Sequence, residues 1–158
     1  MHKGWVIYPD YIKEAEATIG AYSGGDFIDV GMAKEVYLLF LAPKAKNARF
    51  LLLEPNPIFV KPMIATVQAA MENHASFIPY IIPAGAGAEK RRRVEFNTNG
   101  RIFHADIIKI DDLVKSFSLE PGLVKIDVDG PEFFVLEDMK ETTKHFRPSI
   151  LLEMHYSC

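Results

Sequence analysis

Acidic side chains stand where apolar runs of the sequence end, and they are the residues best suited to chemistry. Asp127 and Asp129 follow the mostly apolar run Leu123–Ile126, and Gly130 comes directly after them. An apolar run that ends in acids and a glycine is typical of a buried strand that gives way to a turn. Carboxylates at such a point can act as general bases or bind the polar groups of a ligand.

Two other apolar runs end in the same way. Asp29 lies in the run Phe27–Val30, just before Gly31, and Glu54 follows the run Arg49–Leu53. An acid that ends a second strand, a little over ~20 residues past the first glycine, is placed to accept hydrogen bonds from a ribose. The glycine fingerprint of pyrophosphate-bearing cofactors is missing after Gly31, which disfavours a dinucleotide-dependent oxidoreductase.

Strands and helices that alternate along the chain must position these acids. Strands are predicted over 27–30, 49–53, 76–82, 123–128 and 149–154, with a strand or arm at 5–8 and a hairpin or irregular excursion over 91–110. Helices are predicted over 11–21, 33–42, 58–72, 111–117 and 131–145, and a turn over 83–87. Continuous apolar strands between helices indicate an α/β fold, a Rossmann-like, doubly wound and mostly parallel sheet with helices on both faces.

We expect one domain over 1–158, with an N-terminal arm and helix over 1–23 and a Rossmann-like core over 24–155. The net charge of -3 gives no support for nucleic-acid binding, and Lys90–Arg93 is expected to be a solvated loop or strand edge. No apolar stretch approaches the ~20 residues of a transmembrane helix. The single cysteine, Cys158, fits a reducing compartment. We therefore expect a cytoplasmic protein with no membrane or nucleic-acid partner.

Five motifs taken together resemble the FkbM-type methyltransferases. They are FIDVG at 27–31, LLLEPNP at 51–57, IDDL at 110–113, KIDVDGPE at 125–132 and LLEMH at 151–155. Their order and rough spacing match this family of class I enzymes, which use S-adenosylmethionine. The resemblance implies methylation of a hydroxyl group on a small molecule or sugar.

The same resemblance implies cofactor-binding roles at matched positions. Asp29 and Gly31 would line the methionine end of S-adenosylmethionine. Glu54 would hold the ribose hydroxyls, and Asn56 would lie beside the adenosine. Ala84, in the turn after the third predicted strand, is assigned to the same cofactor site.

Three carboxylates are assigned to the methyl-transfer side: Asp127, Asp129 and Glu132. Hydroxyl methylation needs the nucleophile in line with the sulfonium and usually a base to take its proton. Lys125 is expected to face the opposite side of the strand, and so not to pair with Asp127.

Simpler interpretations stay open for several acids. Asp29 could cap the helix after Gly31, and Glu54 could be a turn residue. An acid at 111 or 112 is expected to cap the helix that follows it. Glu153 and His155 could join the acids of the central strand around a divalent metal, but hydrogen bonding within the cleft is the preferred interpretation, and no metal site is predicted.

The chain departs from the family's pattern in its first loop and at its end. The family commonly reads D-x-G-A-N-x-G there, whereas this chain has Ala33 and Glu35 in place of the asparagine and the second glycine. A glutamate tolerates positive φ poorly, so a catalytically degenerate binding or assembly module is the alternative function. The sequence also ends at Cys158, where full class I enzymes continue into a helix and an antiparallel pair of strands, so we expect either a truncated or a minimal version of the fold. In a minimal version the exposed sheet edge would be consistent with a homodimer.

Overall fold

A five-stranded parallel sheet forms the centre of the computed structural model, which describes residues 9–32, 38–73, 76–98, 100–128, 130 and 132–154. The arm predicted at 5–8 lies outside these ranges. The strand order is β3-β2-β1-β7-β8. The bounds are β1 Asp26–Val30, β2 Arg49–Leu53, β3 Ile78–Ile82, β7 Pro121–Ile126 and β8 Ser149–Leu152. The order reverses between β1 and β7, which creates the topological switch point where ligands bind in such sheets.

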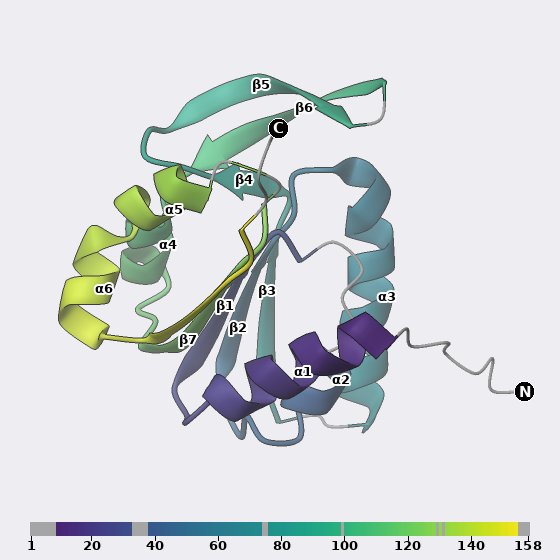
Figure 1. Cartoon of the computed structure of the whole chain (residues 1–158), viewed down its shortest axis with the longest axis vertical. Helices are drawn as coiled ribbons and strands as arrows, with labels where there is room; N and C mark the ends of the chain where they lie inside the picture. The colour runs from purple at the N-terminus through teal and green to yellow at the C-terminus, as the bar shows by residue number, and fades with distance from the viewer. Residues whose placement is uncertain are drawn as a thin grey trace, which may run out of the picture.

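Helices cover both faces of this sheet (Figure 1). One face packs against α1 (Pro9–Ala21), α2 (Leu38–Leu41) and α3 (Pro57–Asn73), and the other against α4 (Ile110–Ser116), α5 (Glu132–Asp138) and α6 (Lys140–Phe146). Phe27 points into the first core and Ile28 into the second, as the alternation of a strand requires. The predicted doubly wound α/β fold is confirmed. No helix in the described ranges is long and apolar enough to cross a bilayer.

A second, three-stranded sheet lies above the carboxyl end of the first, at the top of Figure 1. It contains β4 (Ala84–Ala86), β5 (Arg91–Thr98) and β6 (Arg101–Ile108), in the order β4-β6-β5. The β5–β6 pair confirms the predicted hairpin, but the turn predicted over 83–87 is wrong, because Ala84–Ala86 pairs in parallel with β6. A Cβ on Gly85 would lie 2.9 Å from the end of the Ile107 side chain, so β4 packs closely against β6 at this residue.

The stretch predicted as one helix over 131–145 forms two, α5 and α6, so the predicted continuity is wrong. The break falls at Met139, which has φ −102° and ψ 27°. Asp111 on α4 accepts hydrogen bonds from the N–H of Thr142 at 2.8 Å and from its hydroxyl at 2.6 Å. An acid from another helix therefore caps α6, and this tertiary contact marks the start of a new helix.

The acids in the first turn of α4 do not cap that helix, contrary to prediction. The helix begins at Ile110, and the preceding Lys109 makes no side-chain capping bond. The Ile110 N–H donates instead to Asp138 Oδ2 at 2.5 Å, and Asp112 pairs with Lys90 at 2.7 Å. Asp138 is the last residue of α5. On this face of the sheet, an acid of α5 therefore caps α4, and an acid of α4 caps α6.

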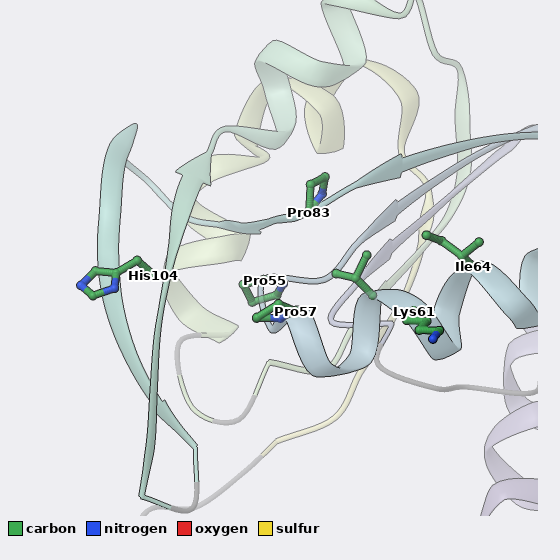
Figure 2. Close-up of a pocket in the computed structure, with 7 residues that line it drawn as sticks. Pro55, Pro57, Lys61, Ile64, Pro83 and His104 are labelled. Atoms are coloured by element: carbon green, nitrogen blue, oxygen red, sulfur yellow. The ribbon is translucent and has the colours of Figure 1, made fainter.

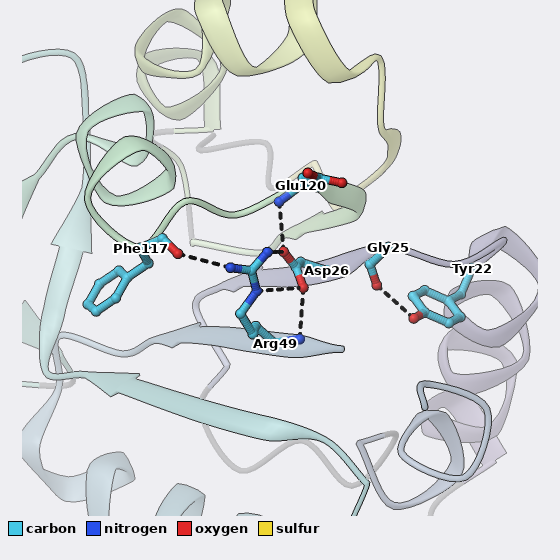
Figure 3. Close-up of polar contacts among 6 residues, drawn as sticks. All are labelled: Tyr22, Gly25, Asp26, Arg49, Phe117 and Glu120. Atoms are coloured by element: carbon cyan, nitrogen blue, oxygen red, sulfur yellow. Dashed lines mark hydrogen bonds and ion pairs between the residues drawn. The ribbon is translucent and has the colours of Figure 1, made fainter. Parts of the chain in front are cut away.

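A partly buried ion pair fixes the amino end of the parallel sheet (Figure 3). Asp26 is 5% exposed, and Arg49 reaches it through Nε at 3.1 Å and Nη2 at 2.6 Å. The Glu120 N–H donates to Asp26 at 2.7 Å, and Arg49 Nη1 donates to the Phe117 carbonyl at 3.1 Å. The hydrogen bond to Asp26 raises the pKa of Arg49 above its ordinary value. This network ties β1 and β2 to the chain segment that enters β7.

We predict that Asp26→Ala lowers the free energy of unfolding by about 3 kcal/mol, since it removes the acceptor of a partly buried guanidinium and of two backbone N–H groups. Urea denaturation followed by circular dichroism measures the change. Lys140→Ala, which removes an exposed pair with Glu137, should change the same quantity by less than about 0.5 kcal/mol. Similar small effects for both variants would contradict the role given to Asp26.

A second prediction concerns Asp138, whose pKa is raised by burial to about 7. The ordinary aspartate value is near 4, so between about pH 4 and pH 7 the folded chain keeps a proton that the unfolded chain has lost. Stability should therefore fall as pH rises through this window. Asp138→Asn keeps an acceptor for the Ile110 N–H and should flatten that fall. Melting temperature against pH tests this, with Glu72→Gln at an exposed position on α3 as control; an unchanged slope in Asp138→Asn contradicts it.

Candidate active site

A cavity of about 910 Å³ opens at the carboxyl end of the parallel sheet, beneath the β4-β6-β5 sheet. The ends of β1, β2 and β7 form its floor, β4, β5 and β6 form its roof, and α5 contributes one side. This volume lies in the upper part of the range for small-molecule sites. The cavity sits at the switch point between β1 and β7, where open α/β sheets bind ligands.

The turn after β2 holds two buried polar side chains in the cavity wall. Glu54 is 4% exposed and Asn56 is 5% exposed. Glu54 Oε1 accepts the Asn56 N–H at 2.7 Å, and Asn56 Oδ1 accepts the Ile58 N–H at 3.0 Å, close to the start of α3. The turn role left open for Glu54 is therefore observed, and the same hydrogen bond fixes its carboxylate at the cavity.

Gly31 joins the ends of the two central strands. Its φ is +87°, and a Cβ at this position would collide with the carbonyl oxygen of Asp127. Its N–H donates to the Leu53 carbonyl at 3.0 Å, and the Asp127 N–H donates to the Val30 carbonyl at 2.9 Å. Glycine is required here by backbone contacts. The altered residues of the first loop, within 33–37, lie outside the described residues.

Asp127 lines the cavity and, contrary to prediction, pairs with a buried cation. The Lys125 Nζ lies 3.5 Å from Asp127 Oδ2, and the lysine side chain is 1% exposed. The prediction that these residues face opposite sides is wrong, because residues two apart in a strand share a face. Lys125 is thus the functional candidate that sequence reasoning missed on β7.

Five of the predicted site residues come together on the walls of this one cavity. They are Gly31, Glu54, Asn56, Ala84 and Asp127. They arrive from the ends of three parallel strands and from β4, so residues nearly 100 positions apart in sequence line one cavity. Their roles toward a ligand stay predictions.

The other predicted residues are not among the described residues that line this cavity. Asp29 is fully buried in β1 and does not line the cavity among the described residues. Glu132 is 3% exposed, accepts the Gly130 N–H at 2.8 Å, and likewise does not line it. Asp129 and His155 lie outside the described residues. Within the described part of the chain, no cluster of three or more His, Cys, Asp or Glu could hold a metal ion.

The roof and side of the cavity contain aromatic residues that the sequence analysis left unassigned. Phe96 and Phe103 stack across β5 and β6, with ring centroids 5.2 Å apart and an interplanar angle of 5°. Phe134 of α5 lines the same cavity and is 57% exposed. The alternation of Val94, Phe96 and Thr98 is the sequence signal that could have found this apolar face.

Charged residues on the described walls are mostly acidic. Glu54, Glu89, Asp127 and Glu137 line the cavity together with one basic residue, Arg91. Arg91 pairs with Glu89 at 3.2 Å. A cavity with this balance favours a ligand that carries positive charge.

A smaller cavity of about 310 Å³ shares Pro55 with the large one (Figure 2). Pro57, Pro83 and Ile64 give it a largely apolar wall, with Lys61 and His104 at its sides. No residue predicted to be functional lines it, so we place the candidate active site in the larger cavity.

Comparison with known proteins assigns the class of this chain. Residues 19–157 match the model of the methyltransferase FkbM domain, and the chain belongs to this family. No curated protein matches the sequence.

Two solved structures are similar in fold. The methyltransferase FkbM of Methylobacillus flagellatus KT has a TM-score of 0.63 at 16% identity over 82% of this chain and 32% of its own. A proposed O-methyltransferase of Klebsiella pneumoniae has a TM-score of 0.47 at 11% identity, over 84% of this chain and 52% of its own. The chain thus spans about a third of the length of the first protein and about half of the length of the second.

We predict that Gly31→Ala lowers the free energy of unfolding by at least about 2 kcal/mol, since it adds steric overlap with Asp127 to a strained φ. Gly100→Ala is the matched control: Gly100 has φ +78° but nothing within 4 Å of an added Cβ. Gly100→Ala should lower the free energy of unfolding by about 1 kcal/mol, from backbone strain alone. Chemical denaturation measures both changes. Equal losses of unfolding free energy in the two variants would mean that β1 and β7 are not in close contact at Gly31.

Proposed function

We propose that this chain is the catalytic core of an S-adenosylmethionine-dependent methyltransferase that acts on a hydroxyl group. The observation that carries the proposal is one cavity at the switch point that brings together Glu54 from the end of β2 and Asp127 from the end of β7. Membership of the FkbM domain family supports the transferase class.

The described walls fit the cofactor in both charge and hydrogen-bonding capacity. Glu54 is buried at the end of the second strand, where a carboxylate can accept the hydroxyl hydrogens of a ribose. Asn56 and Ala84 line the same cavity and would border the adenosine. The acidic balance of the cavity suits a ligand with a sulfonium cation. When bound, the cofactor supplies a methyl group on positively charged sulfur.

The protein side of the reaction follows from the remaining walls. Asp127 would accept the proton of the acceptor hydroxyl as general base while that oxygen is held in line for attack. Phe96, Phe103 and Phe134 offer apolar surface for the body of a small-molecule or sugar acceptor. The β4-β6-β5 sheet covers the site, which would keep water away from the reacting atoms.

Titration with S-adenosylhomocysteine tests the proposal. A ligand that binds only the folded chain must raise its melting temperature, so we expect a clear shift at millimolar ligand. Glu54→Gln keeps an acceptor for the Asn56 N–H but loses the carboxylate, and should weaken binding about tenfold by calorimetry. Glu72→Gln, an exposed acid on α3, is the control and should bind as the unaltered chain does.

Two results would count against this function. An absence of any shift at millimolar S-adenosylhomocysteine would favour the binding or assembly module instead. Unchanged affinity in Glu54→Gln would remove the ribose role from this residue while leaving the cofactor assignment in place.

A further inference from the structure

Lys125 is a buried lysine near the end of the central strand β7. Its side chain is 1% exposed, and burial of a cation is costly unless acids compensate for its charge. The Nζ lies 3.5 Å from Asp127 Oδ2. Asp127 lines the large cavity whereas Lys125 does not, so any effect of Lys125 on a ligand there acts through Asp127 or through its charge.

The neighbouring strand places a second acid on the same face. Asp29 of β1 is the register partner of Lys125, and residues paired in register on adjacent strands project to the same side of the sheet. Below this pair the same face is apolar, with Phe27 and Leu123 in the core packed under α1–α3. Asp29, Lys125 and Asp127 therefore form a charged group at the upper limit of that core, with a formal net charge of -1.

We propose that Lys125 is a positioning residue that holds Asp127 at the cavity wall and sets the charge against which a sulfonium-bearing ligand binds. With the lysine present, the three side chains offer one net negative charge; without it they would offer two. This inference rests on the proposed function, since it assumes that the sulfonium cofactor occupies the cavity.

An effect of the Lys125 charge on the ligand can be distinguished from an effect on folding by comparing two ligands of different charge. S-adenosylmethionine and S-adenosylhomocysteine differ by one methyl group and one positive charge, so the ratio of their affinities reports the electrostatic potential at the sulfur. Charges act strongly in a partly buried site, where the effective dielectric is far below that of water. A residue with only a structural role would weaken both ligands alike and leave this ratio unchanged.

Calorimetric titration of both ligands against four variants is the experiment. Lys125→Met, which removes the cation, should raise the ratio of the affinity for S-adenosylmethionine to that for S-adenosylhomocysteine about three- to tenfold. Asp127→Asn should lower it by a similar factor. The double variant restores the formal charge of the three side chains and should return the ratio to within about twofold of the starting value. Lys46→Met, the same change at an exposed position before β2, is the control and should not alter the ratio.

The outcomes are distinguishable. Opposite shifts for the two single variants support the proposal, and an unchanged ratio in Lys125→Met overturns it while the proposed function stands. If the unaltered chain binds neither ligand, the proposed function fails and this inference fails with it. The melting curve of Lys125→Met shows whether this variant folds. If it does not, Lys125→Gln takes its place, because glutamine removes the same charge but keeps a hydrogen-bond donor. The same rise in the affinity ratio is expected.

Discussion

The site depends on the close approach of two parallel strand ends. At Gly31 the chain leaves β1 against the carbonyl of Asp127, and the Asp127 N–H donates back to Val30 at 2.9 Å. This contact leaves no room for a side chain, so glycine is fixed by geometry. It also places the acid of β7 beside the end of β1, where the strand order reverses and ligands of open α/β sheets bind.

The second sheet turns this strand edge into a cavity. Gly85 and its small neighbours let β4 lie against Ile107 of β6, and the hairpin then extends over the floor. Aromatic side chains such as Phe96 face inward, and α5 closes one side with Phe134. The floor carries most of the residues that resemble the FkbM pattern, whereas the roof is built from residues outside those motifs.

Buried charge recurs where elements meet, and each instance has a different physical role. Asp26 joins β1 to Arg49 on β2 and to the segment before β7 at the amino end of the sheet. Asp138 accepts the first N–H of α4 but remains costly to ionise, and burial raises its pKa to about 7. Lys125 lies at the opposite end of the sheet, next to Asp127 in the cavity wall. Acids thus organise the fold away from the cavity and line it at the sheet's carboxyl edge.

The sequence by itself determined the parallel sheet, because apolar runs such as Arg49–Leu53 can be buried on both faces only between helices. It also placed acids at strand ends, since a strand's last residue is visible in the pattern. The shared face of Lys125 and Asp127 also follows from the alternation of a strand, although the prediction for this pair is wrong. The sequence could not determine which distant segments meet: Ala84–Ala86, predicted as a turn, pairs with β6. Those contacts, and the caps that divide α5 from α6, join residues distant in sequence, so only the tertiary structure decided them.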